Sequence, residues 1–309
     1  MKKFNIDFYK NKKIFFIISI AIIVVGLIFN VVFGATLDIQ FAGGAMIKYA
    51  VDGDVDSNEI DGLVEEATGR NVSVTTNQII GSDDYQITVS FAGNEGVTLD
   101  EQQAVAEELS AAYADRTFSV VESSSVDPTM GAKFFQKCLV CLAITIALLL
   151  GYIALRFRKI GGLSAGVTAI IALLHDVAIV YFAFVIFGFS INDVFIAVIL
   201  TILGYSLNDT IVIYDRIREN RKLYPSKDVA DLPVILNKSL NQTMARSIMT
   251  SVTTFMALLV IYVVATVYGL TTVATFALPM MVGVVAGCYS SLCIAAPLYT
   301  MWAMRKANK

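Results

Sequence analysis

Four ionisable residues stand in stretches of the sequence that are otherwise apolar. Asp209 occurs in "GYSLNDTIVIYDR", His175 and Asp176 are neighbours in "ALLHDVAIV", and Arg246 occurs in "LNQTMARSIMTS". A charged side chain inside a bilayer costs about 2.5–3.5 kcal/mol on insertion scales, so a retained one is a candidate for function. The chemistry that suits such residues is the binding and release of a proton or a small cation.

Asp209 is the strongest of these candidates. Ser206, Asn208 and Thr210 lie within one helical turn of it, and their hydroxyl and amide groups could hold water or an ion. A carboxylate that is reversibly protonated in such a patch is how pumps and transporters carry protons. The alternative is a structural hydrogen bond between helices, or a side chain that reaches the inner membrane surface.

Arg246 is the expected neighbour of Asp209. The two should lie at similar depth, about one turn inside the inner boundary of the membrane. An opposite charge there would help to keep the carboxylate ionised. The alternative for Arg246 is an ordinary basic anchor at the membrane surface. His175 and Asp176 are supporting candidates for transport, with hydrogen bonds to neighbouring helices as the alternative.

Asp176 and Asp209 should not share a proton directly. A tight turn at 188–192 joins their two segments, so Asp176 should lie level with Leu203. At 1.5 Å of rise per residue, Asp209 is then roughly 9 Å closer to the cytoplasm. This separation, and the lack of a Gly-x-Gly-Asp motif at Asp209, argue against an intramembrane aspartyl protease. We therefore expect energy coupling of the secondary-transport type, without covalent catalysis.

The composition requires a membrane for these residues. Hydrophobic residues make up 56% of the chain and charged residues 16%, with a mean hydropathy of +0.69, beyond the usual composition of soluble domains. A helix needs roughly 20 predominantly apolar residues to cross a bilayer. Six segments qualify, at about 14–34, 133–155, 163–187, 191–214, 247–267 and 273–302.

Basic residues set the expected orientation, because Lys and Arg collect at cytoplasmic span ends. Four clusters fall on one side: Lys10, Lys12 and Lys13; Arg156, Arg158 and Lys159; Arg216, Arg218, Arg221 and Lys222; and Arg305, Lys306 and Lys309. Both termini are therefore expected in the cytoplasm, with 35–131 outside. That region holds 18 of the 26 acidic residues and three basic ones, so its charge does not suit nucleic acid.

The cysteines and the single histidine predict neither a disulfide framework nor a metal site. All four cysteines lie in apolar segments, and none lies in the external region. Cys138 and Cys141 spell C-x-x-C but lack the βαβ context of a redox motif, so we interpret them as small packing residues. No cofactor other than a coupling ion is expected.

Periodicity divides the chain into three parts: 1–34 with the first span, an external domain at 35–131, and spans two to six at 132–309 with a cytoplasmic loop at about 215–243. In the external domain we expect strands at 45–51, 71–80, 85–91 and 117–122 and helices at 57–69 and 98–113. This β-α-β-β-α-β order is the ferredoxin-like pattern. The fold class is thus an α-helical membrane protein of six spans with an external α+β domain, which we interpret as an interaction module.

Six motifs together resemble the SecF family, whose members are subunits of the SecDF protein-export complex in the resistance-nodulation-division transporter superfamily. They are "LDIQFAGGAMI", "ESSSVDPTMG", "ALLHDV", "GYSLNDTIVIYDRIREN", "SLNQTMARSIMTS" and "SSLCIAAPL", in that order along nearly the whole chain. The resemblance implies that Asp209 belongs to an ion route and that Arg246 works with it. It also implies a bacterial inner-membrane location, SecD, the SecYEG channel and YajC as partners, and export of preproteins driven by H⁺ or Na⁺.

The chain shows no internal duplication, so we expect a separate protein to supply the second half of the transporter. Six spans with one large loop after the first form half of the superfamily's usual pattern. Small residues could serve contacts with that second half or within the chain: Gly161, Gly162, Gly166, Gly283, Gly287 and Ser291. A half-transporter for small-molecule efflux and a passive translocon scaffold are the alternative functions.

Overall fold

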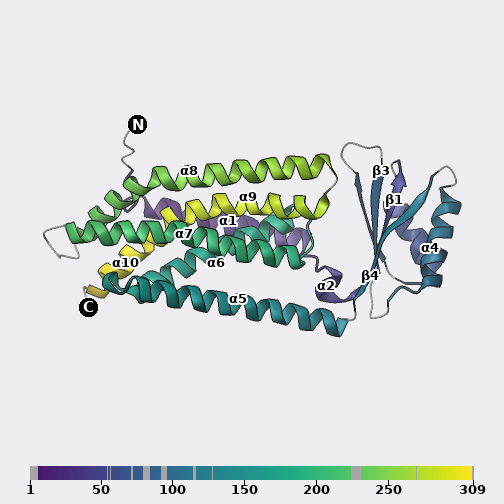
Figure 1. The fold of residues 1–309 in the computed structure, drawn as a ribbon, viewed down its shortest axis with the longest axis horizontal. Coiled ribbons are helices and arrows are strands. Elements are labelled where there is room, and N and C mark those ends of the chain that lie inside the picture. The colour runs from purple at the N-terminus through teal and green to yellow at the C-terminus, as the bar shows by residue number, and fades with distance from the viewer. Residues whose placement is uncertain are drawn as a thin grey trace.

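Six long apolar helices form a bundle, and a small α+β unit lies at one end of it (Figure 1). The computed structural model describes residues 6–53, 55, 57–70, 72–78, 84–91, 96–113, 116–126, 128–223, 231–268 and 270–307. The first five long helices are α1 (Lys12–Phe33), α5 (Pro128–Arg156), α6 (Gly162–Ile186), α7 (Asp193–Leu223) and α8 (Leu232–Val267). The last consists of α9 (Thr271–Ser290), a π-helical segment (Ser291–Ala295) and α10 (Ala296–Ala307). The six expected spans are thus present as helices long and apolar enough to cross a membrane.

The spans differ strongly in how much of their surface the protein covers. In the most apolar stretch of each, 72% of residues are buried in the last span and 56% in α6, against 6% in α5 and 11% in α1. The last span and α6 therefore form the centre of the bundle, with α7 beside them, while α1 and α5 present apolar side chains outward. Such an apolar outer surface fits a lipid environment.

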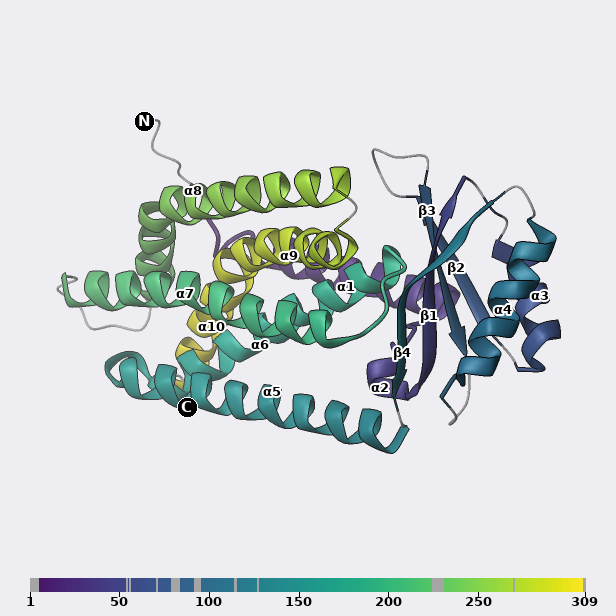
Figure 2. The same cartoon turned by 45° about the vertical axis from the view of Figure 1, so that its right-hand side comes forward.

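Two helices extend well beyond the spans expected from hydropathy. α7 continues from the expected end at 214 to Leu223, and α8 begins at Leu232, where a proline occupies the first turn. Figure 2 shows α8 bent, with its first turns lying across the end of the bundle that holds both termini. The expected loop at about 215–243 is therefore largely helical, and its part at 224–230 lies outside the described residues.

The α+β unit has the expected order of elements. Its parts are β1 (Gly44–Asp52), α3 (Ser57–Thr68), β2 (Val72–Gln78), β3 (Asp84–Phe91), α4 (Leu99–Ala112) and β4 (Phe118–Val126). The strands form an antiparallel sheet in the order β2-β3-β1-β4, and α3 and α4 cover one face. Residues 71 and 79–83, which belong to the expected second strand and the turn after it, lie outside the described part of the chain.

Alternation along the strands places the core of this unit between sheet and helices. Ile47 and Tyr49 on β1 and Ile87 and Val89 on β3 are fully buried, with α3 and α4 contributing Ile60, Val64, Val105 and Leu109. Side chains two residues apart lie on the same face of a strand, which is why these positions share one side of the sheet. This core is separate from that of the bundle.

A short helix that the sequence did not predict joins the unit to the bundle. α2 (Ile39–Ala42) is capped by Asp38, whose carboxylate accepts from the Gln40 N–H at 3.0 Å. Its buried Phe41 packs on Phe134 and Phe135 of α5, with ring centroids 5.6 and 5.1 Å apart. The backbone beside it also bonds to Ile191, in the turn between α6 and α7. The base of the α+β unit is therefore held by two parts of the bundle.

Candidate functional site

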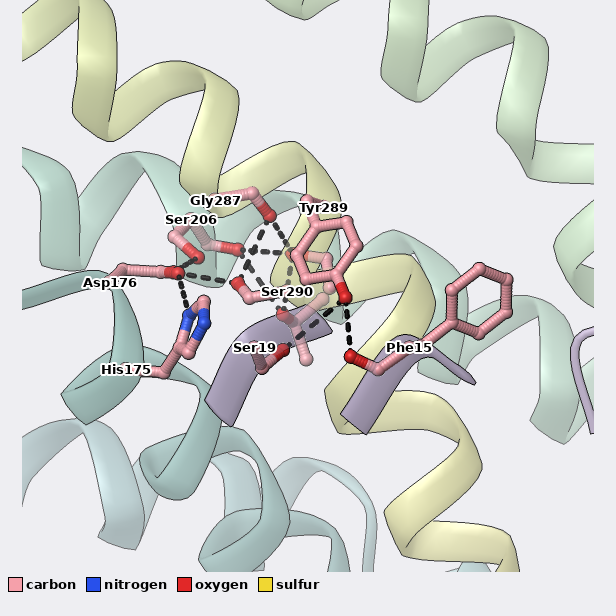
Figure 3. Close-up of polar contacts among 10 residues, drawn as sticks. Phe15, Ser19, His175, Asp176, Ser206, Gly287, Tyr289 and Ser290 are labelled. Atoms are coloured by element: carbon pink, nitrogen blue, oxygen red, sulfur yellow. Dashed lines mark hydrogen bonds and ion pairs between the residues drawn. The ribbon is translucent and has the colours of Figure 1, made fainter. Parts of the chain in front are cut away.

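Asp176 lies fully buried where α6, α7 and α9 meet (Figure 3). Its Oδ2 accepts hydrogen bonds from the Ser206 hydroxyl at 2.6 Å and the Ser290 hydroxyl at 2.7 Å. Its Oδ1 lies 3.2 Å from Nδ1 of His175. One carboxylate thus joins three helices, with a partner on each.

Close approach of α9 to α7 makes these hydrogen bonds feasible. A Cβ at Gly287 would lie 3.0 Å from the Cβ of Ser206, and one at Gly283 would lie 2.5 Å from Cδ1 of Ile202. A side chain at Gly283 would therefore require the Ile202 side chain to shift, and one at Gly287 would require Ser206 to move by a few tenths of an ångström. The sequence left open whether these glycines pack within the chain or against a second half of the transporter. Gly283 and Gly287 pack within the chain.

The polar layer continues into the π-helical segment. The Thr210 hydroxyl donates to the Ser291 hydroxyl at 3.1 Å, and Ser291 donates to the carbonyl of Gly287 at 2.8 Å. The consecutive residues Ser290 and Ser291 thus reach two different partners, Asp176 and Thr210. Single π turns inside α-helices often occur at functional sites.

The layer also extends toward α1. The Tyr289 hydroxyl donates to the carbonyl of Phe15 at 2.7 Å and lies 3.3 Å from the hydroxyl of Ser19 (Figure 3). The ring centroids of His175 and Tyr289 lie 6.2 Å apart. The buried Nε2 of His175 has no hydrogen-bond partner among the described residues. The sequence suggested hydrogen bonding for His175 and Asp176, and the structure supplies the partners.

Asp209 occupies a second polar site, between α7 and α8. Its Oδ1 accepts from the Ser247 hydroxyl at 2.6 Å. Its Oδ2 is buried and has no hydrogen-bond partner in the part of the chain that the structure describes. A buried carboxylate oxygen without a donor is costly, so such an atom requires an explanation. Asp209 therefore remains the most conspicuous ionisable group of the bundle.

Arg246 does not pair directly with Asp209 in this structure. Arg246 is exposed, and no ion pair within 4 Å joins the two side chains. The next residue, Ser247, contacts Asp209 instead. Because successive residues of an α-helix point about 100° apart, Ser247 faces α7 while Arg246 faces outward. Asn208 is exposed as well, so it does not line the buried part of this site.

Ser206 and Thr210 also have other partners than the sequence suggested. Ser206 serves Asp176, and Thr210 bonds to Ser291, so neither hydroxyl belongs to the Asp209 site. Asp176 thus lies at the level of Ser206 rather than Leu203, about 4.5 Å along the helix from Asp209. Counting residues outward from the turn was wrong by three residues, because it assumes two straight helices of equal tilt.

The described residues hold no group of three His, Cys, Asp or Glu side chains placed to bind a metal ion. The four cysteines are free thiols. The functional candidates that the sequence analysis missed are hydroxyl groups: Ser19, Ser247, Tyr289 and Ser290. Their signal in the sequence is weak, because serine and tyrosine are common in apolar helices and pair with a carboxylate only after the helices pack.

The fold and these two sites define a multi-pass membrane protein with carboxylates at the interfaces between its helices. Residues 105–305 match the family described as "Protein export membrane protein SecD/SecF, C-terminal". The chain belongs to this SecD/SecF family of bacterial protein-export membrane proteins. Its place is therefore the bacterial inner membrane.

Relatives support this assignment over almost the whole chain. The chain is 35% identical over 299 residues to the protein translocase subunit SecF of Petrotoga mobilis, covering 95% of both chains. It is 33% identical over 310 residues to SecF of Alicyclobacillus acidocaldarius, covering 98% of this chain and 94% of that one.

Solved structures of SecDF share the fold. The crystal structure of SecDF from Thermus thermophilus, titled a translocon-associated membrane protein, matches 99% of this chain with a TM-score of 0.80 and 26% identity. SecDF in a super-membrane-facing form matches 100% of it with a TM-score of 0.66 and 28% identity. The chain spans about two-fifths of the length of these SecDF chains.

Proposed function

We propose that this chain couples the movement of an ion, H⁺ or Na⁺, to late steps of preprotein export through the SecYEG channel, together with SecD. The observation that carries the proposal is the buried Oδ2 of Asp209, which has no donor among the described residues. Such an oxygen is where a proton or a cation gains most by binding. Oxygen from a carboxylate and a nearby hydroxyl suits either ion, so Asp209 alone does not select between them.

SecD is the proposed partner, and the outer face of α7 is the surface that supports this. Thr201, Gly204 and Asn208 are exposed along one stripe of α7, and a Cβ at Gly204 would meet nothing within 4 Å. Small residues at such a spacing let a second helix approach closely, and polar groups such as the Asn208 amide are costly against lipid. The chain also matches 39% of the protein translocase subunit SecDF of Bacillus subtilis, whose name combines SecD and SecF.

Arg246 is proposed to act from this same side of the bundle. It is exposed on α8, next to the serine that holds Asp209. An exposed guanidinium within the apolar length of a span calls for a partner, and helices of SecD would cover it. In the complex with SecD, Arg246 would then lie beside the ion route. In the chain alone, it does not bond to Asp209.

The α+β unit is proposed to be a ferredoxin-like domain, 35–131, that stands outside the cytoplasm and engages emerging polypeptide. Its order of elements and its own core support an independent domain. Both termini lie at the opposite end of the bundle (Figure 1). With the basic clusters at that end, the positive-inside rule supports a cytoplasmic location for both termini and for the loop at about 215–243.

The decisive variant is Asp209→Asn, which keeps the size of the side chain but cannot ionise. Late-stage translocation of a preprotein is measured under an imposed H⁺ or Na⁺ gradient, in membranes with verified levels of each variant. We expect gradient-driven translocation to be abolished. Asp193→Asn is the matched control, because Asp193 is an exposed residue at the start of the same helix. Normal translocation by Asp209→Asn would show that the carboxylate is structural.

Two variants of Arg246 test its charge separately from its shape. Arg246→Lys keeps the charge but loses the planar fork of the guanidinium, whereas Arg246→Met loses both. We expect export to be impaired by Lys and impaired further by Met. Equal export by all three proteins would contradict a role for Arg246.

The proposed orientation is checked by labelling. Single cysteines at Ser110, exposed on α4, and at Leu223, exposed at the end of α7, should react with a membrane-impermeant maleimide from opposite sides. The parent chain measures the background from its four native cysteines. Labelling of both positions from one side would contradict the six-span topology.

A further inference from the structure

A basic cavity lies at the end of the bundle that holds both termini. Its volume is about 670 Å³, and it is lined by the start of α6, the end of α7 and α10. Three cations line it, Lys159, Arg221 and Lys306, together with the indole of Trp302. No Asp or Glu is among its described lining residues, and none of the three cations forms an ion pair within that part of the chain. Among the described residues that line the cavity, the charged side chains are therefore all positive.

The beginning of α6 adds to this positive potential. Gly161, Gly162, Leu163 and Ser164 line the cavity, and no side chain caps the helix. Gly161 has a φ of +94°, a conformation that favours glycine, and it lets α6 begin directly after the short 3-10 helix at Arg158–Ile160. The first N–H groups of a helix have no partner within the helix and attract anions. Backbone donors and three cations thus converge on one space.

A second, more apolar groove of about 500 Å³ adjoins the cavity. Leu298, Met301 and Arg305 line it, and it shares Trp302 and Lys306 with the basic cavity. Tryptophan and long basic side chains are typical of the membrane interface. The two spaces together have an anion-binding part and an apolar part, in the order in which a phospholipid presents its headgroup and its chains.

We propose that this site binds an anionic phospholipid of the inner leaflet. The headgroup phosphate lies among Lys159, Arg221, Lys306 and the N-terminus of α6, and an acyl chain lies along Leu298 and Met301. Basic pockets between membrane helices on the cytoplasmic side are suited to anionic headgroups. An acidic peptide or a nucleotide would use the cations but would leave the apolar groove empty, so a lipid accounts for both parts.

Trp302 provides the measurement, because it is the only tryptophan of the chain. The full chain is reconstituted in phosphatidylcholine vesicles that contain, at equal mole fraction, either brominated phosphatidylglycerol or brominated phosphatidylcholine. Bromine quenches tryptophan emission on contact, so the ratio of quenching gives the preference of the site for the anionic lipid. We expect stronger quenching by phosphatidylglycerol. Equal quenching by the two lipids would overturn the proposal.

Charge variants show whether the cavity is responsible. Each cation near a membrane surface strengthens binding of an anionic lipid about fivefold. The triple variant Lys159→Gln, Arg221→Gln, Lys306→Gln should therefore lose the preference for phosphatidylglycerol. If the triple variant does not fold, Lys306→Gln alone is measured, and it should lower the preference about fivefold. A matched variant, with glutamine at Lys10, Lys13 and Lys222, removes as much charge from the same end. The proposed site would be contradicted if the cavity variant kept the preference for phosphatidylglycerol, or if the matched variant lost it equally.

Inorganic phosphate distinguishes a lipid from a soluble anion. Added phosphate should leave the preference unchanged relative to chloride at the same ionic strength, because only the lipid also occupies the apolar groove. Loss of the preference with phosphate alone would assign the cavity to a soluble phosphate instead.

Discussion

Replacement of Asp176 by alanine should destabilise the bundle by about 1–3 kcal/mol. The carboxylate accepts one hydroxyl from α7 and one from α9, at 2.6 and 2.7 Å. Hydrogen bonds between membrane helices average about 0.6 kcal/mol and reach about 1.7 kcal/mol, so two of them account for this range. The Ser206 hydroxyl loses its acceptor in the variant, whereas Ser290 also lies 3.3 Å from the carbonyl of Gly287. Asp176→Asn should cost less than half as much, because an amide can bond to both hydroxyls.

The assay is reversible unfolding of the full chain in mixed detergent, followed by far-ultraviolet circular dichroism. Thr145→Ala is the matched control, because Thr145 is half-buried on α5 and its hydroxyl bonds to the carbonyl of Cys141 in its own helix. We expect that control to differ little from the parent. Equal stability of Asp176→Ala and Thr145→Ala would refute the view that this carboxylate holds three helices together.

Further predictions concern helix packing and the α+β unit. Gly283→Ala should destabilise the bundle by about 1–3 kcal/mol in the same unfolding assay, because its Cβ would overlap Ile202, whereas Gly151→Ala, with nothing within 4 Å, should be neutral. The isolated segment 37–127 should fold as a monomer, and Thr98→Ala should cost it about 1 kcal/mol by loss of the capping box, measured by urea unfolding. The Thr98 N–H, donating at 2.7 Å, lowers the pKa of the partner carboxylate, Glu101, below its ordinary value of 4.5, so this contribution is complete above pH 4.5 and is lost as the pH falls further. A difference in stability between the parent and Glu101→Gln that stays constant between pH 6 and 3 would contradict this.

The spans and the order of the elements could be predicted because they depend on local pattern. Runs of apolar residues identify membrane helices, and alternation at Ile47 and Tyr49 or Ile87 and Val89 identifies half-buried strands. The short helix α2 escaped prediction because four residues carry no detectable period. Its position is fixed by contacts of Phe41 with α5, nearly a hundred residues away in sequence.

The sites were predictable only in part. Hydropathy marked Asp176 and Asp209 as unusual, because each is an acidic residue within a long apolar segment. It could not say which hydroxyl each would meet, since this depends on the rotation and tilt of neighbouring helices. Ser206 was assigned to the wrong aspartate for this reason, although it lies only three residues from Asp209 in the chain.

The π-helical segment divides the last span into two helices of different phase. A π turn contains about one residue more than an α turn, so everything after Ser291–Ala295 is displaced by one residue relative to an unbroken α-helix. One residue corresponds to a rotation of about 100°. α9 is thus oriented by Ser290 on Asp176, while α10 is oriented separately by Tyr299, whose hydroxyl donates to the carbonyl of Ile160 at 2.6 Å. Deletion of a single residue from 291–295 would remove the extra residue and leave an unbroken α-helix in which both hydrogen bonds persist. An unbroken α-helix of the present sequence would instead rotate α10 by about 100° and break one of them.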